Sequence, residues 1–198
     1  GTAKGSDGVI DLAFNASVPE GRLQQRRLSD ASLAFTGTLQ GSDLTGSVNG
    51  DAFLDGHRVT LASDAALLGE TQRLSGLKFT TTGTTLTGDV ARNEAGLLDG
   101  AIKLDAPDIT LAASLFLMEA SGSAKADVAL SHTNADQNAT IDASIRDLVL
   151  DGVRVGAADV KASIEDLFGV PTVDGTVNGQ NIVAAGYEVT TLTARATK

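Results

Sequence analysis

The regular alternation of apolar and polar residues is the feature that most constrains what this chain of 198 residues can fold into. Between Val9 and Val18, for example, Ile10, Leu12 and Phe14 are each separated from the next apolar position by a single residue. Alternation over such a length is typical of a β-strand with one apolar and one polar face. Parallel strands, which are buried on both faces, give continuous apolar runs instead. The pattern therefore predicts an antiparallel all-β protein.

The alternation recurs along nearly the whole chain. It is found in residues 31–39, 42–50, 57–63, 76–82, 84–90, 98–104, 124–130, 140–145, 158–164 and 172–179. Three segments can also be aligned with one another as strand, short polar loop and second strand: 45–63, 87–106 and 174–194. An imprecise repeat of hairpins predicts an elongated sheet. We therefore expect residues 1–198 to form a single elongated β-repeat segment from the interior of a longer protein.

Glycines that follow Asp or Asn mark the positions at which the chain is expected to turn or bulge, because these pairs adopt left-handed conformations at low steric cost. The pairs are Asn49-Gly50, Asp55-Gly56, Asp99-Gly100, Asp151-Gly152 and Asn178-Gly179. Helical signals are weak by comparison. They are limited to residues 64–74 and to the apolar stretch that follows Pro107.

That apolar stretch runs from Ile109 to Met118 without a charged residue. As a helix it would span about 15 Å, which is half of the hydrocarbon thickness of a bilayer. Pro107 and Asp108 suit the first turn of a helix. We therefore expect a short helix or irregular segment that packs over the apolar face and does not cross a membrane.

Composition and motifs argue against several classes of function. The chain has 25 acidic and 15 basic residues, a net charge of −10, whereas nucleic-acid binding needs a basic surface. It has no cysteine, and His57 and His132 lack the spacing of metal ligands. No nucleophile elbow, phosphate-binding loop or dinucleotide-binding motif is present. We therefore predict that the protein is not an enzyme and uses no cofactor or metal, and that the basic run from Arg22 to Arg27 is a solvated loop.

The apolar face of the predicted sheet is the remaining candidate for a binding surface. Aromatic residues make up only 4% of the chain, so this face is mostly aliphatic. Two interpretations remain open: the closed core of a β-sandwich, or an open surface on which acyl chains lie without directional contacts. The candidate groove residues are Ile10, Leu12, Phe14, Leu33, Phe35, Leu39, Val48, Val59, Leu61, Leu77, Phe79, Leu86, Val90, Ile102, Leu104, Leu111, Leu115, Val128, Leu130, Ile141, Ile145, Val160, Ile164 and Val177.

One stretch resembles a known family. The sequence LDGAIKLDAPDITLAASLFLMEASGSAKADVALS, residues 98–131, is similar to the periplasmic repeat region of the TamB family of AsmA-like, bridge-like lipid transfer proteins. In that family a strand leads into an APD-hydrophobic segment, then a Gly-Ser step, here Gly122-Ser123, and another alternating strand. The segments LSGLKFTTTGTTLTGDV and VTTLTARAT are similar in style. The resemblance implies a curved, mainly antiparallel sheet folded like a taco around an open apolar groove, with at most one or two short helices.

The resemblance also implies a function and a location. It implies that the protein lies in the Gram-negative periplasm and is anchored in the inner membrane by a part outside this segment. Its groove would carry phospholipid acyl chains between the inner and outer membranes and support outer-membrane protein assembly. A barrel partner of the TamA/Omp85 type would bind another part of the protein. The alternative is a structural or adhesive all-β module, of the surface-fibre or autotransporter-passenger type, with a closed core.

Overall fold

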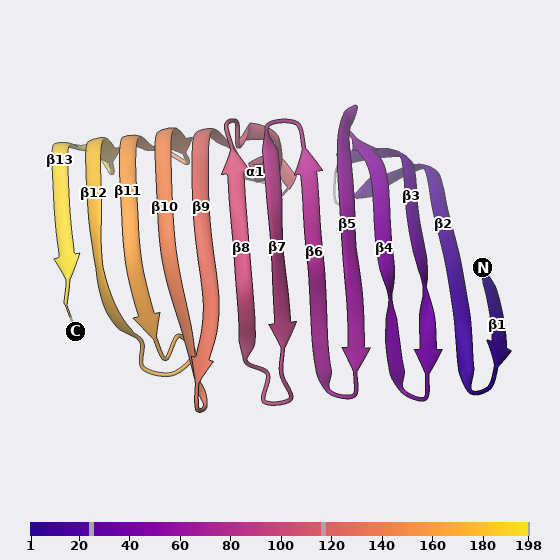
Figure 1. Cartoon of the computed structure of the whole chain (residues 1–198). Coiled ribbons are helices and arrows are strands. Elements are labelled where there is room, and N and C mark those ends of the chain that lie inside the picture. Colours follow the sequence, from indigo (N-terminus) through magenta and orange to yellow (C-terminus); the bar gives the residue numbers. More distant parts are fainter. Residues whose placement is uncertain (24–25, 116–117, 198) are drawn as a thin grey trace. The chain divides into compact units, whose positions relative to one another are not determined.

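The computed structural model describes residues 1–23, 26–115 and 118–197, and for Leu115 the backbone alone. Within these residues the chain forms thirteen strands and one short helix (Figure 1). The strands pair in chain order as a single open antiparallel meander. The predicted antiparallel all-β class is therefore confirmed, and the helical content is a single short helix.

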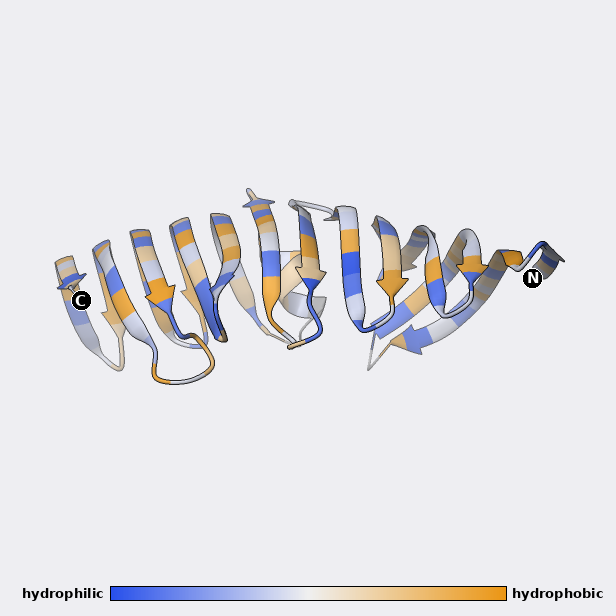
Figure 2. Cartoon of the chain, turned by 60° about the horizontal axis from the view of Figure 1, so that its bottom comes forward, coloured by the Kyte–Doolittle hydropathy of each residue, from blue (hydrophilic) through white to orange (hydrophobic). Residues whose placement is uncertain are grey.

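Each strand from β2 to β12 covers one of the alternating stretches of the sequence, and most of these strands extend beyond it. The first seven strands are β1 (Thr2–Ser6), β2 (Val9–Leu23), β3 (Arg26–Gln40), β4 (Asp43–Leu54), β5 (His57–Leu68), β6 (Thr71–Thr81) and β7 (Thr84–Arg92). The others are β8 (Leu98–Ala106), β9 (Ala120–Thr133), β10 (Asp136–Leu150), β11 (Val153–Glu165), β12 (Thr172–Ala184) and β13 (Tyr187–Ala196). Figure 2 shows the consequence as apolar and polar bands that alternate along the strands.

The chain divides into two compact units, which are described separately. Unit 1 comprises residues 1–82 and 86–96, and unit 2 comprises residues 83–85 and the chain from Leu97 onward. Few of the described side chains are fully buried in either unit. The buried hydrophobic residues are Leu54 in unit 1 and Leu97, Ala106 and Ala139 in unit 2. Within each unit, most of the apolar face therefore keeps some contact with water.

Some of the predicted turns are present and others are not. Asp55-Gly56 and Asp151-Gly152 form tight hairpins in which both residues have positive φ, as the favoured two-residue turns require. Asn49-Gly50 and Asn178-Gly179 instead lie within β4 and β12, so the prediction of a turn or bulge is wrong at these pairs. Asp99-Gly100 lies in β8, where Gly100 alone has a positive φ. At the two incorrect pairs, pairing with the neighbouring strands overrides the local turn preference.

A β-bulge interrupts the strict alternation of apolar and polar residues in β10 of unit 2. The pairing of β9 with β10 shifts between Arg146 and Val149, where Asp147 has a φ of 51°. An extra residue in one strand changes which side chains share a face beyond it. Accordingly, Leu148 and Leu150 are half-buried, whereas Val149 between them is exposed. Simple alternation along β10 does not predict this change.

The only helix of the described residues is α1 (Thr110–Leu115), which packs against β9. The Thr110 amide donates to Asp108 Oδ1 at 2.9 Å, and the Ala113 amide donates to the Ile109 carbonyl at 2.8 Å. The predicted short helix after Pro107 is thus confirmed. The helical signal over 64–74 is wrong, because these residues belong to β5, a turn at Gly69 and β6. None of the described helical residues forms a helix long and apolar enough to span a membrane.

A candidate apolar binding surface

In unit 1, strand pairing aligns the predicted groove residues in rows that cross the strands. Residues directly opposite each other in an antiparallel ladder have side chains on the same face. The successive rows are Ile10–Leu39–Leu44–Leu67, Leu12–Gly37–Gly46–Ala65, Phe14–Phe35–Val48–Ser63 and Ala16–Leu33–Gly50–Leu61–Phe79. Val59 lies opposite Ala52 in a further row, and Leu77, Leu86 and Val90 lie on β6 and β7. One face of unit 1 therefore collects side chains that are far apart in sequence.

An open hollow of about 470 Å³ lies on unit 1. It arises where small residues stand beside larger aliphatic ones. Its lining comprises Ala16, Val18, Ala31, Ser32, Leu33, Gly50, Asp51, Ala52, Val59, Thr60, Leu61 and Phe79. Its volume falls within the range of small-molecule sites, roughly 300–1,000 Å³. The alternating pattern predicted Leu33, Val59, Leu61 and Phe79 as residues of the apolar face. The depth of the hollow depends on the small residues beside them, which the pattern did not single out.

Phe35 borders this hollow rather than lining it. A Cβ atom placed on either Gly37 or Gly46 would lie 2.8 Å from Phe35 Cζ. The aromatic ring therefore lies over the glycine pair, in the row on the side away from Leu33 and Leu61. Without side chains on these glycines, the ring has room to lie against the sheet and leaves the hollow open.

In unit 2 the rows of the apolar face are aliphatic. Its rows are Gly100–Leu130–Ala139–Ile164–Val173, Ile102–Val128–Ile141–Ala162–Gly175, Leu104–Ala126–Ala143–Val160–Val177 and Ala106–Ala124–Ile145–Ala158–Gly179. Leu111 lies on α1 and is half-buried, and the Leu115 side chain lies outside the described part of the chain. These rows contain no aromatic residue. Within unit 2 the predicted residues thus align as an aliphatic surface.

The exposure of the predicted residues is similar in the two units. Every one whose side chain is described is half-buried or exposed, and none is fully buried. Phe14 retains 51% and Leu33 retains 43% of its accessible surface. Both values are high for large side chains on the apolar face of a sheet, because such residues are usually buried.

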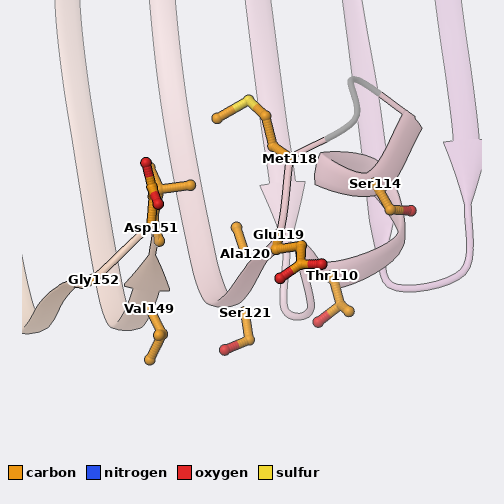
Figure 3. A pocket seen from close by; sticks show the side chains of 10 residues that line it. Thr110, Ser114, Met118, Glu119, Ala120, Ser121, Val149, Asp151 and Gly152 are labelled. Carbon is orange, nitrogen blue, oxygen red and sulfur yellow. The ribbon is translucent and has the colours of Figure 1, made fainter.

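A second and wider hollow, of about 1,040 Å³, lies in unit 2 beside α1. Figure 3 shows its lining, to which α1, the segment before β9 and the β10–β11 turn contribute side chains. Thr110, Ser114, Glu119, Ser121 and Asp151 give it a more polar lining than that of unit 1. Asp108, just before the helix, has its pKa lowered by the hydroxyl and then the amide of Thr110, which donate to its carboxylate.

The opposite face of the sheet is charged, and its side chains pair across the strands. In unit 2, Lys161 Nζ lies 2.5 Å from Asp142 Oδ2, and Arg146 Nη2 lies 2.8 Å from Asp159 Oδ1. The Asp142 carboxylate, through its hydrogen bond and then its charge, raises the pKa of Lys161. These groups are exposed, so each pair contributes little to stability. The face is a solvated surface.

Among the described residues, no group of three or more His, Asp or Glu side chains is placed so that it could hold a metal ion. His132 Nδ1 lies 2.8 Å from Asp99 Oδ2 across β8 and β9, and His57 is exposed. The prediction of a loop from Arg22 to Arg27 is wrong for the described residues, because Arg22 belongs to β2 and Arg26 and Arg27 belong to β3. Arg26 pairs with Asp55 and Arg27 with Glu20. Glutamine 137 is the polar residue that sequence reasoning missed. Its side chain is fully buried and bonds to the backbone of Leu98 and Ser131.

Comparison of the chain with models of protein families, with curated proteins and with solved structures finds no match.

Proposed function

We propose that the apolar face of this sheet carries phospholipid acyl chains, and that the hollow in unit 1 is a place where such a chain rests. The observation that carries the proposal is a large set of aliphatic side chains, aligned on one face, that remain half-exposed. Burial of a methylene group contributes about 0.8 kcal/mol. Because hydrophobic contacts are non-directional, a chain held in this way remains able to slide.

The wider setting follows the family resemblance of residues 98–131 and belongs to the same proposal. The segment would lie in the periplasm of a Gram-negative bacterium, within a protein anchored in the inner membrane. It would form part of a bridge for lipid to the outer membrane and support the assembly of outer-membrane proteins. A barrel of the TamA/Omp85 type would be the partner, bound through another part of the protein. This role involves no catalysis and no cofactor.

The alternative, a structural or adhesive module with a closed core, predicts a different state of the same residues. A closed core would bury the large apolar side chains almost completely. The exposure of Phe14 and Leu33 supports the open surface over a closed core.

The test is lipid extraction from the purified protein, with a charge placed on each face of one strand. Leu33→Glu places a carboxylate in the hollow, and Thr36→Glu places one on the polar face of the same strand. We expect phospholipid, measured by mass spectrometry of organic extracts, to fall at least severalfold in Leu33→Glu and to be unchanged in Thr36→Glu. The hollow is open, so Leu33→Glu should remain folded by circular dichroism.

Two results would contradict the proposal. One is a folded Leu33→Glu protein with the same lipid content as wild type. The other is a lipid-free wild-type protein that Leu33→Glu unfolds, since an unpaired charge in a closed core costs several kcal/mol. The second result would favour the structural module.

A further inference from the structure

The loop between β11 and β12, residues 166–171, presents apolar side chains to solvent. Phe168 is 67% and Val170 is 83% exposed, and Leu167 between them and the sheet is 36% exposed. Figure 2 shows this loop as an apolar segment beyond the ends of the strands. Isolated exposed apolar residues are common, but a cluster at the tip of one loop is typical of an interaction site.

Hydrogen bonds within the loop and from the loop to β10 hold it in a fixed conformation. Asp166 Oδ2 accepts from the Val170 amide at 2.8 Å, and the Asp166 carbonyl accepts from the Gly169 amide at 3.1 Å. The Leu167 amide donates to the Gln137 carbonyl at 2.7 Å. Because the tip is already ordered, binding through Phe168 and Val170 loses little conformational entropy.

The loop is also continuous with the apolar face of unit 2. Ile164 and Val173, the residues of β11 and β12 nearest the loop on that face, are paired directly with each other. Val173 is 39% exposed. The same row continues through Ala139 and Leu130. An acyl chain that leaves a bilayer at the loop would therefore meet an apolar surface within a few residues.

The charges around the loop favour an uncharged surface as the partner. No residue from Leu167 to Thr172 is charged, and Glu165, Asp166 and Asp174 flank them. No Lys or Arg occurs between Lys161 and Arg195. Basic residues are what attract a protein to anionic lipids. The adjoining segments therefore lack the groups that would bind anionic headgroups, while apolar side chains can enter the interface of a zwitterionic bilayer.

From these observations we infer that the 166–171 loop is a docking tip, which inserts Phe168 and Val170 into the surface of a zwitterionic phospholipid bilayer and brings the Ile164–Val173 end of the apolar face of unit 2 to it. As the point where acyl chains are exchanged, it rests on the proposed function. As a site of membrane contact, it is measured independently of lipid carriage.

The experiment is co-flotation of the full chain with phosphatidylcholine vesicles. We expect wild type to float, and Phe168→Ser with Val170→Ser to lower the bound fraction about tenfold or more, because two apolar side chains no longer leave water. Tyr187→Ser is the matched control, since Tyr187 is 77% exposed and begins β13, just after the turn at the other end of β12. It should bind like wild type. Vesicles enriched in phosphatidylglycerol should bind less protein than phosphatidylcholine vesicles.

A spectroscopic reporter checks insertion directly. The chain contains no tryptophan, so Phe168→Trp introduces a single one at the tip. Its emission should shift to shorter wavelength when phosphatidylcholine vesicles are added and should be quenched by brominated acyl chains. An unchanged spectrum would overturn the inference.

Other outcomes also overturn the inference. One is wild-type protein that does not float, and another is equal loss of binding in Tyr187→Ser. A change in the sedimentation coefficient of Phe168→Ser without vesicles would identify the tip as a protein contact. None of these results touches the proposed function if lipid still extracts with wild type and falls in Leu33→Glu. Conversely, normal flotation with no extracted lipid would remove lipid carriage and leave the docking tip.

Discussion

Units 1 and 2 are built from the same kind of hairpin, yet their apolar faces differ. In unit 1, Phe14, Phe35 and Phe79 share the face with alanines and glycines, and a hollow forms between large and small side chains. In unit 2 the corresponding rows contain only aliphatic residues and glycine. The hollow of unit 1 is thus lined by small residues beside larger ones, Phe79 among them, whereas the hollow of unit 2 lies beside α1 and has a more polar lining.

The two units also differ in how their strands are held together. Unit 2 contains Gln137, whose amide nitrogen donates to the Leu98 carbonyl at 2.8 Å and whose amide oxygen accepts from the Leu98 amide at 2.6 Å. In unit 1 the notable feature is the direct opposition of Gly37 and Gly46, where β3 and β4 approach closely. Mutations at these two places therefore act differently. At Gln137 they remove buried hydrogen bonds, and at the glycine pair they introduce a clash with the backbone.

The largest effect is expected from Gln137→Leu. The substitution keeps an apolar body but leaves the Leu98 amide and carbonyl without their partner, and each unsatisfied buried group costs about 1–3 kcal/mol. We expect a loss of roughly 2–5 kcal/mol in the free energy of unfolding. Hydrogen exchange should show faster exchange at the Leu98 and Leu167 amides in unit 2, with little change in unit 1.

Gln180→Leu provides the control for this substitution, because Gln180 is exposed on β12 of the same unit. It should change stability by less than about 0.5 kcal/mol. Equal losses of stability at positions 137 and 180 would show that the buried hydrogen bonds of Gln137 do not stabilise unit 2.

An intermediate effect is expected from Gly46→Ala in unit 1. The added Cβ would lie 2.5 Å from the Thr36 carbonyl oxygen and 2.7 Å from Gly37 Cα, so the backbone itself has to move. We expect about 1–3 kcal/mol of destabilisation by chemical denaturation. Gly50→Ala on the same strand is the matched control, since its nearest neighbours would be Leu61 Cβ and Leu33 Cδ1 at 3.5 and 3.6 Å. If the two variants were equally stable, close approach at Gly46 would not distinguish unit 1.

The smallest effect concerns the start of α1, which belongs to unit 2 alone. Because the folded-state pKa of Asp108 is lowered, its charged form stabilises this turn. The stabilisation that the Asp108 carboxylate gives to this turn is complete above the ordinary pKa of aspartate, about 3.9, and is lost as the pH falls through the lowered pKa. The amide chemical shift of Thr110 should therefore titrate with a midpoint below the ordinary value. Asp108→Asn should abolish this titration, and a midpoint at or above the ordinary value would contradict the prediction.

Much of this fold was predictable because a strand that buries one face repeats its pattern every second residue. The alternating stretches fall on β2 to β12, although most of these strands extend several residues beyond them, and the short helix after Pro107 was also expected. The helical signal over 64–74 failed because local propensity was outweighed by the pairing of β5 with β6. Asn49-Gly50 failed for the same reason, as β4 continues through it to pair with β3 and β5.

By itself, the sequence determined the strand class, the antiparallel pairing and which residues share a face wherever a strand is regular, because these depend on neighbours in the chain. Only the tertiary structure decided which rows meet across strands. It placed Ala31 and Ala52 beside Leu33 and Leu61 to open a hollow, and it buried Gln137 against Leu98, 39 positions away. These features depend on register and on bulges such as that at Asp147, which shift the alternation by one residue. The pattern within a single strand contains no information on the register with its neighbours or on the position of a bulge.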